Sequence, residues 1–269
     1  MGVVETVLRL SDPYERHARL YPALLVFAPI GLTAICLHGA NISLLAGAVS
    51  LLAGCGLLFW IASLVRDAGK KREQGLFDSW GGKPTTQLFR HRNHEIDVVT
   101  KKRYHAMLSK ALGITFPSVE DESANPAAAD QTYASATKWL IEKTRDPVRY
   151  ALLLKENYSY GFHRNMLGAR LLGPVIALAA IAWVLVELVI ELGAQPVSLA
   201  DKLFAIPLTH KIPLVGSGVL LLMWIFGVNA ERARVAAFAY AERLLAACET
   251  VAVSPESGAA NNSQHTSST

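Results

Sequence analysis

Four long stretches of apolar residues divide the chain, and polar sequence separates them. The stretches run from Leu20 to Leu37, Ile42 to Val65, Leu171 to Leu192 and Ile212 to Val228. Each is close to the roughly 17 to 25 residues that a helix needs to cross the hydrocarbon of a bilayer. The pattern predicts an all-α membrane protein with four transmembrane helices in two hairpins, at 20–65 and 169–228.

Lys and Arg residues are distributed unevenly around these stretches. Three precede the first stretch, 18 lie between Arg66 and Arg170, and three follow the fourth, whereas the expected external turn at 38–41 has none. Because Lys and Arg resist translocation across an energised membrane, both termini and the middle segment are expected to be cytoplasmic. The predicted location is the bacterial inner (cytoplasmic) membrane, with the lipid bilayer as the first partner.

The polar sequence supplies four further parts of the predicted organisation. They are a cytosolic N-terminal segment at 1–19, a mainly helical cytosolic middle domain at 66–168, a cytosolic amphipathic helix at 229–253 and a disordered tail at 254–269. The middle domain contains 11 aromatic residues, which a disordered linker would lack, so we expect it to have a folded core. The apolar stripe of the 229–253 helix could pack on the middle domain or on a second copy of the chain.

The middle domain has helical periodicity and two helix boundaries that can be read from single residues. Apolar spacing predicts three helices, at 96–112, 127–144 and 147–160. Asp146 followed by Pro147 marks the start of the third, because the carboxylate can accept hydrogen bonds from free amides and proline suits the first helical position. Gly161 is expected to end this helix and act as a hinge. The segment 116–130, with two prolines and an acidic run, is expected to be an exposed loop.

Histidines in the middle domain suggest a metal site. His91, His94, Asp97 and His105 combine imidazoles three residues apart with a nearby carboxylate, a set that could hold Zn²⁺ or a similar ion. Basic residues surround them, however, and neighbouring cations oppose a second positive charge. A solvated basic face is therefore the alternative interpretation.

Basic residues on both sides of this cluster could form a face that binds anionic lipid head groups or another anionic ligand. The candidates are Arg66, Lys70, Lys71, Arg72, Arg90, Arg92, Lys101, Lys102 and Arg103. Nucleic acid is not the expected partner. Gly81, Gly82 and Lys83 do not complete a phosphate loop, since Phe77 stands where its first glycine belongs, and a tight turn that presents Trp80 is expected instead.

Two features of the transmembrane stretches bear on assembly. Glu187 and Glu191 lie one helical turn apart near the outer end of the third stretch. They either reach outward into water or, in a homo-oligomer, line a cation path as two acidic rings, where water or a cationic partner would have to stabilise them. Small residues recur every fourth position at 46–54 and at 169–177, which predicts two closely packed helix faces.

The run from Thr144 to Asn165, together with Trp80–Thr86 and the basic residues at 90–92, resembles motifs of uncharacterised bacterial four-transmembrane proteins with a cytosolic middle domain. The resemblance implies a bacterial inner-membrane protein of unassigned activity, and it implies no mechanism.

These patterns favour a non-enzymatic membrane sensor, regulator or effector. Its cytosolic domain would couple a signal or a partner protein to the membrane helices, and an oligomeric pore is one form of output. The alternatives are a membrane-tethered metal-dependent hydrolase that uses the His91, His94, Asp97 and His105 cluster, and a transporter or membrane-complex subunit. Enzymatic function is the minority interpretation, because the sequence pairs no nucleophile with a base, and no cofactor is expected.

Overall fold

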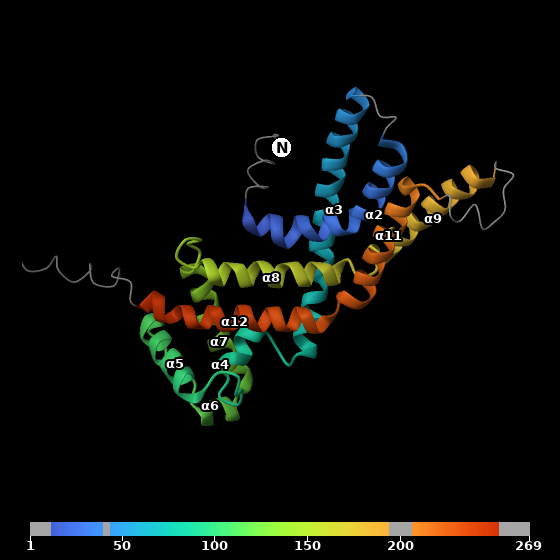
Figure 1. The fold of residues 1–269 in the computed structure, drawn as a ribbon. Helices are drawn as coiled ribbons and strands as arrows, with labels where there is room; N and C mark the ends of the chain where they lie inside the picture. Colours follow the sequence, from blue (N-terminus) through green and yellow to red (C-terminus); the bar gives the residue numbers. More distant parts are fainter. Residues whose placement is uncertain (1–11, 40–43, 194–205, 253–269) are drawn as a thin grey trace, which may run out of the picture. The chain divides into compact units, whose positions relative to one another are not determined.

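The computed structural model describes residues 12–39, 44–193 and 206–252 (Figure 1). Every regular element in these ranges is helical, which confirms the predicted all-α class. The described residues form two compact units. One, the bundle unit, contains the chain up to Leu76 and Tyr158–Arg234, and the other, the core unit, contains Phe77–Asn157 and the chain from Val235.

Three helices of the bundle unit are long and apolar enough to cross a membrane: Glu15–His38, Leu172–Glu191 and Leu208–Gly227. Their elements are η1 (Glu15–Leu20) with α2 (Tyr21–His38), α9 (Leu172–Gly193), and α11 (Leu208–Leu222) with η3 (Met223–Gly227). Helices α2, α9 and α11 pack against one another. These elements match the first, third and fourth apolar stretches of the sequence.

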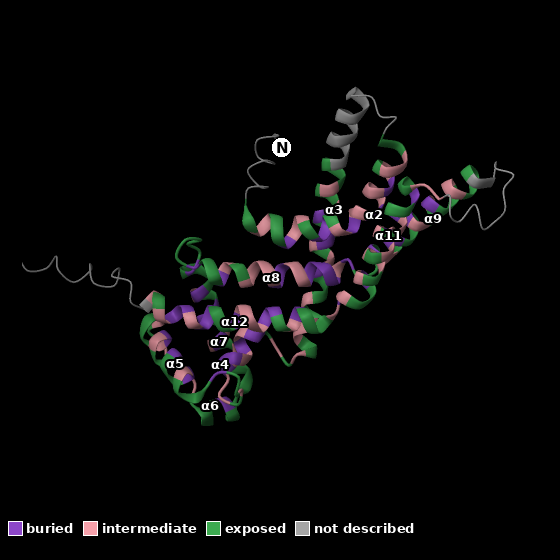
Figure 2. Cartoon of the chain, in the orientation of Figure 1, coloured by how far each residue is buried: buried purple, intermediate pink, exposed green. Residues whose placement is uncertain are grey.

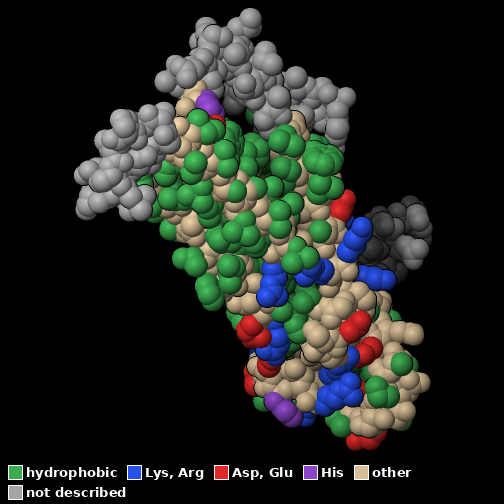
Figure 3. Space-filling view, turned by 90° about the vertical axis from the view of Figure 1, so that its right-hand side faces the viewer, with side chains coloured by type: hydrophobic (Ala, Val, Ile, Leu, Met, Phe, Trp, Pro, Cys, Tyr) green, Lys and Arg blue, Asp and Glu red, His purple; other side chains and the backbone are tan. Residues whose placement is uncertain are grey.

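Large apolar side chains on the outside of this bundle remain uncovered. Ile35 is 71% exposed, Val189 70% and Phe226 73%. In Figure 3, hydrophobic side chains cover a continuous area in which charged side chains are few. Such a surface is costly in water and favourable against lipid tails, so the structure supports a membrane protein with three candidate spans.

The second apolar stretch falls within α3 (Leu44–Ser79), a helix of 36 residues. Residues 42 and 43, residues 40 and 41 of the turn expected at 38–41, and most of the second expected external connection lie outside the described residues, as do the side chains of 44–54. The fourth span and the small-residue face at 46–54 therefore stay predictions. The helix itself continues well beyond Val65, the predicted end of that span.

The small-residue face of the third stretch is confirmed. Ala169 and Ala177 are buried, and a Cβ atom on Gly173 would lie 2.2 Å from the indole ring of Trp224. The missing side chain of Gly173 thus lets the fully buried Trp224 lie against the helix backbone, where close packing provides van der Waals contact.

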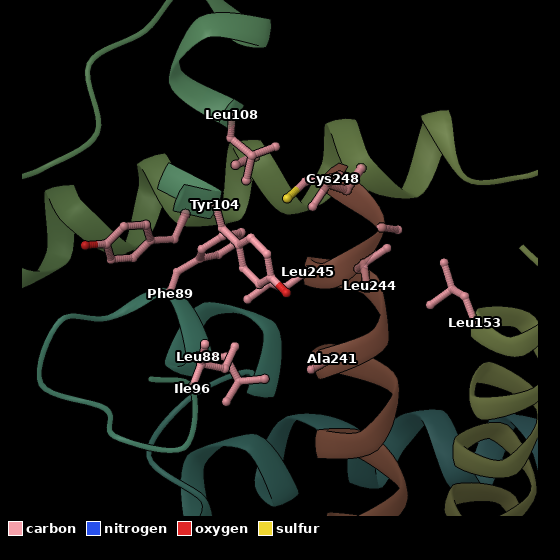
Figure 4. Close-up of a cluster of buried hydrophobic side chains, with 14 of the residues drawn as sticks. Leu88, Phe89, Ile96, Tyr104, Leu108, Leu153, Ala241, Leu244, Leu245 and Cys248 are labelled. Carbon is pink, nitrogen blue, oxygen red and sulfur yellow. The ribbon is translucent and has the colours of Figure 1, made fainter. Parts of the chain in front are cut away.

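The core unit is built from helices of 6 to 23 residues around one apolar cluster. Its elements are α4 (Pro84–Phe89), α5 (Val98–Leu112), α6 (Val119–Ala124), α7 (Pro126–Lys143), the start of α8 (Ala151–Gly168) and most of α12 (Ala230–Ala252). Figure 4 shows Phe89, Tyr104 and Leu245 among the side chains that meet in this cluster. The predicted folded core of the middle domain is therefore present.

Helix α12, which was predicted from the sequence as a separate part of the chain, contributes to this core. Ala241, Leu245 and Cys248 are buried in the cluster, and Figure 2 shows buried and exposed positions alternating along the helix. The apolar stripe of α12 was expected to pack on the middle domain or on a second copy of the chain. In the structure it packs on the middle domain. Val235, at the start of the stripe, is 60% exposed and does not join it.

One segment of the core unit that was predicted to be a loop is helical. The segment 116–130 is not a loop: Ser118 caps α6 with a reciprocal capping box, and α7 begins at Pro126 with Asn125 as its cap. The acidic run at 120–122 supplies first-turn carboxylates, which favour a helix start. One of them, Glu122, is buried.

The helix predicted at 147–160 begins later and ends later. The carboxylate of Asp146 accepts hydrogen bonds from the amides of Val148 (2.8 Å) and Arg149 (3.2 Å), but these residues form a turn, and α8 starts at Ala151. The helix then passes through Gly161 to Gly168, so the expected hinge at Gly161 is wrong. A Cβ atom at Gly161 would lie 2.7 Å from that of Ala18, and the glycine therefore serves close packing.

The turn expected after Trp80 is present. Gly81 and Gly82 have φ angles of 85° and 127°, a backbone region that glycine alone enters easily, and the amide of Gly82 donates to the carbonyl of Phe77. Helix α4 begins directly after this turn, at Pro84, which has no amide hydrogen to donate to a phosphate.

Candidate functional site

An ion pair between the buried Arg164 and the partly buried Glu73 joins α3 to α8 inside the bundle unit. Nη1 of Arg164 lies 3.1 Å from Oε1 of Glu73, and the hydroxyl of Tyr160 donates to the same oxygen at 2.8 Å. Asn165, which is fully buried, accepts from the Arg164 guanidinium and donates from Nδ2 to the carbonyl of Ala18. We call Glu73, Tyr160, Arg164 and Asn165 the polar node.

Glycines let the helices approach closely enough for these contacts. A Cβ atom on Gly168 would lie 2.4 Å from the amide nitrogen of Gly69, and one on Gly69 would lie 2.6 Å from Oδ1 of Asn165. Both distances are far below van der Waals contact, so the backbones of α3 and α8 cross in direct contact. The polar node is held in place by this crossing on one side and by Ala18 of η1 on the other.

The electrostatics of the polar node favour its charged state. Burial opposes the charge of Arg164, but Tyr14, Glu73 and Tyr160 outweigh it and raise the pKa of the guanidinium. Burial, reinforced by Glu73, also raises the pKa of the Tyr160 hydroxyl, which therefore stays protonated and donates. A cation that is 6% exposed on its side chain thus depends on one carboxylate. Removing that carboxylate would leave the cation unpaired in a low-dielectric environment.

Sequence reasoning did not find the polar node. Tyr160, Arg164 and Asn165 belong to the run that was singled out for its resemblance, but Glu73 lies 91 residues before Arg164. The available signal was local: Arg164 and Asn165 directly precede an apolar stretch, in a segment where the apolar pattern calls for burial. Charged residues at such positions need a partner, and the sequence alone does not name it.

The predicted metal ligands are not brought together as a ligand set. Nε2 of His91 lies 2.9 Å from the carbonyl of Pro117, and Nε2 of His105 lies 3.0 Å from that of Phe89. Asp97 caps α5 by accepting from the amide of Thr100, and His94 is exposed. Across the described ranges, no group of three or more His, Cys, Asp or Glu side chains is arranged to hold a metal ion.

The main chain of His91 belongs to a hydrogen-bond network centred on the buried Glu122. One of its carboxylate oxygens accepts from the amide of His91 and from the hydroxyl of Tyr133, each at 2.8 Å. Burial disfavours the carboxylate, but these donors hold the pKa of Glu122 below its usual value. His105 lies among aromatic rings, 4.9 Å from that of Phe116. Burial, reinforced by His91, lowers the pKa of His105 to about 4.

This histidine should make the core unit sensitive to acid. Unfolded His105 has a pKa near 6.5, so below that pH the unfolded chain binds a proton that the folded core excludes. The stabilisation of the folded core unit that depends on neutral His105 is therefore complete above about pH 6.5. As the pH falls toward 4, the free energy of unfolding decreases by on the order of 3 kcal/mol. We expect His105→Phe to flatten the pH dependence of hydrogen-exchange protection in α5 and α7. His94→Gln is the control, and equal slopes for wild type and His105→Phe would contradict the prediction.

The nine candidates for the predicted basic face are divided between the two units. Arg66, Lys70, Lys71 and Arg72 belong to the bundle unit and the other five candidates to the core unit. The prediction is wrong for Arg90, whose guanidinium is occupied because it donates to both carboxylate oxygens of Asp130 at 2.9 and 2.7 Å. Lys101 is also wrong: it is 4% exposed and donates to the carbonyls of Arg90 and Asn93. The exposed Arg92 and Arg103 pair with Glu122 and Glu249, and the exposed Lys102 stays a candidate.

Glu187 and Glu191 each face a histidine of a neighbouring helix within the same chain. His38 at the end of α2 lies 3.9 Å from Glu187, and His210 of α11 lies 3.4 Å from Glu191. Trp183 also donates to Glu187, at 3.3 Å. The cationic partner that the acidic pair was expected to need is therefore available when the imidazoles are protonated. The acidic rings of a homo-oligomer stay a prediction.

Comparison of the chain with protein families, with curated proteins and with solved structures finds no significant match. The resemblance to four-transmembrane bacterial proteins accordingly stays a prediction, and the function has to be argued from the chain's own geometry.

Proposed function

We propose that the chain is a non-enzymatic membrane sensor or regulator, in which the core unit receives a signal or a partner and the bundle unit responds. The observation that carries the proposal is the polar node. Its charged pair joins α3 and α8, the two helices that lead along the chain to and from Phe77–Asn157. A buried ion pair contributes little net stability compared with apolar packing, but its energy depends steeply on the positions of its two partners.

The proposal assigns the core unit to the cytoplasm of a bacterial cell and the bundle unit to its inner membrane. Its support is the concentration of 18 Lys and Arg residues between Arg66 and Arg170. The metal-dependent hydrolase receives no support from the placement of His91 and His105, whose Nε2 atoms both lie at carbonyl oxygens. An oligomeric pore is one form that the bundle unit's response could take, and a transporter or membrane-complex subunit is the alternative function.

Two native cysteines allow the coupling to be measured. Cys36 is half-buried in α2 of the bundle unit, and Cys248 is buried in the core unit, while Cys55 is exposed and would be replaced by Ser. Leu245→Ala opens the core by removing a fully buried side chain, a change that typically costs about 2 to 5 kcal/mol. Val99→Ala, at a side chain that is 74% exposed, is the matched control.

We expect Leu245→Ala to change the thiol-labelling rate of both cysteines in detergent-purified, monodisperse protein, and Val99→Ala to change neither. Adding Glu73→Gln should abolish the response of Cys36 while leaving that of Cys248, because the pair that couples α3 to α8 has lost its charge. If Leu245→Ala changes Cys248 alone, the core unit does not signal to the bundle unit and the proposal fails. If Cys36 still responds in the Glu73→Gln background, the polar node is not the coupling element.

A further inference from the structure

A small pocket of about 90 Å³ lies in the bundle unit where the third candidate span ends. The span's last residue, Gly227, lines it, and two non-helical residues then separate the span from α12, which starts at Ala230. Leu25, Phe162 and Met223 give the pocket apolar walls from three different helices. The volume is that of a few heavy atoms, enough for one small head group and too little for a nucleotide.

The polar part of the pocket is suited to an anion. Arg232, His163 and Asn229 line it, and its lining includes no Asp or Glu. In contrast to Arg164, Arg232 has no carboxylate within ion-pair distance among the described residues. Burial, with a contribution from Arg232, lowers the pKa of His163, so its imidazole is uncharged at neutral pH and can hydrogen-bond to a ligand without adding charge.

The first turn of α12 carries Arg232 together with Glu231, which is outside the pocket lining and pairs with Arg234. Arg232 lies in this turn, and its amide donates to Oδ1 of Asn229 at 3.0 Å. The amino end of a helix of 23 residues carries a partial positive charge, which favours an anion beside it. The charge of Arg232 and the end of the helix therefore act on the same small volume.

The surroundings of the pocket are those of a membrane interface. Leu222 and Phe226, in the turns that lead to Gly227, are 56% and 73% exposed and face outward from the bundle. Gly173, near the start of α9, packs against Trp224, so the start of α9 and the end of the third span lie at the same end of the bundle. Lipid tails next to these side chains would bring a head group to the level of Gly227.

We propose that this pocket binds the phosphate of an anionic phospholipid, with Arg232 as the charged contact and the exposed apolar side chains beside it covering the acyl chains. The proposal does not depend on coupling between the two units. A lipid is favoured over free phosphate because the pocket has apolar walls and adjoins a surface that water would not solvate well.

The test is native mass spectrometry of the full chain, purified in a neutral detergent and incubated with equal amounts of phosphatidylglycerol and phosphatidylcholine that carry the same acyl chains. We expect phosphatidylglycerol to be retained over phosphatidylcholine. Arg232→Gln should lower this preference about tenfold, the order expected for one charge-assisted contact to phosphate. Arg170→Gln removes an exposed cation just before α9, outside the pocket lining, and should change the preference less than twofold.

A second variant tests the cavity instead of the charge. A Cβ atom on Gly227 would make ordinary contact with Met223 at 3.5 Å, so Gly227→Leu should fold, fill the pocket and also abolish the preference. Equal retention of both lipids by the wild type overturns the proposal, as does an Arg170→Gln effect as large as that of Arg232→Gln. Displacement of bound phosphatidylglycerol by millimolar inorganic phosphate would show a free-anion site and would also overturn it.

Discussion

Glu73→Ala should destabilise the bundle unit by about 3 kcal/mol, at the low end of the cost of breaking a buried ion pair, because Arg164 is buried while Glu73 is 23% exposed. The substitution removes the only carboxylate that the described residues place at Arg164, and the guanidinium cannot lose its proton to escape the low-dielectric environment. Tyr160 would lose its acceptor at the same time. Thermal unfolding of the full chain in detergent, followed by near-ultraviolet circular dichroism, would measure the effect.

The double variant Glu73→Ala with Arg164→Met separates a lost attraction from a stranded charge. If the stranded cation is the main cost, the double variant should be more stable than Glu73→Ala alone, because no charge remains to be buried. Glu142→Ala is the matched control: its pair with Arg145 lies on the surface of the core unit, at 63% and 71% exposure. That change should cost less than about 1 kcal/mol. Equal effects of Glu73→Ala and Glu142→Ala would contradict the prediction.

Gly168→Ala and Gly75→Ala should change stability in opposite directions. A methyl group at 168 would lie 2.4 Å from the amide nitrogen of Gly69 and 2.7 Å from the carbonyl of Val65, both backbone atoms that cannot rotate away. The helices would have to separate, at about 1 to 3 kcal/mol or more. At the exposed Gly75 of α3 a Cβ atom would meet nothing within 4 Å, so alanine should stabilise the helix by up to about 1 kcal/mol.

The two glycine variants are compared with the wild type by thermal melting and by the fraction of protein that elutes as a monodisperse peak in detergent. Because both changes are glycine to alanine in long helices of the bundle unit, intrinsic helix propensity favours alanine in both. A Gly168→Ala variant that melts at or above the wild-type temperature would show that α3 and α8 do not cross in direct contact.

Apolar stretches and one helix end could be read from the sequence because they depend on neighbouring residues, whereas the boundaries expected at Asp146 and Gly161 were wrong. The first, third and fourth stretches lie in helices that could span a membrane, and Gly113 ends α5 in the left-handed conformation expected of a terminal glycine. The segment 116–130 was misread because its prolines and acidic residues suit a helix start as well as a loop. Only the reciprocal bonds of Ser118 and Asp121 distinguish the two.

The polar node and the hydrogen-bond partners of the histidines could not be predicted from the sequence, because they depend on contacts between residues far apart in the chain. Glu73 and Arg164 look like two solvated surface charges until the glycines of α3 and α8 bring the backbones together. His91 and His105 do come close, with ring centroids 5.0 Å apart, as a metal site would require. Their Nε2 atoms nevertheless lie at main-chain carbonyls, and sequence spacing carries no information about that choice.

The second half of α12 also sets the order in which the protein can be completed during synthesis. Ala241, Leu245 and Cys248 are translated after the last candidate span, whereas Leu88, Tyr104 and Leu108, beside which they are buried, are translated before α9. A nascent chain therefore has to keep an unfinished apolar surface on α4 and α5 until both later spans have been made. During that interval the surface is open to chaperones and to aggregation, and the core closes only after the carboxyl-terminal helix has left the ribosome.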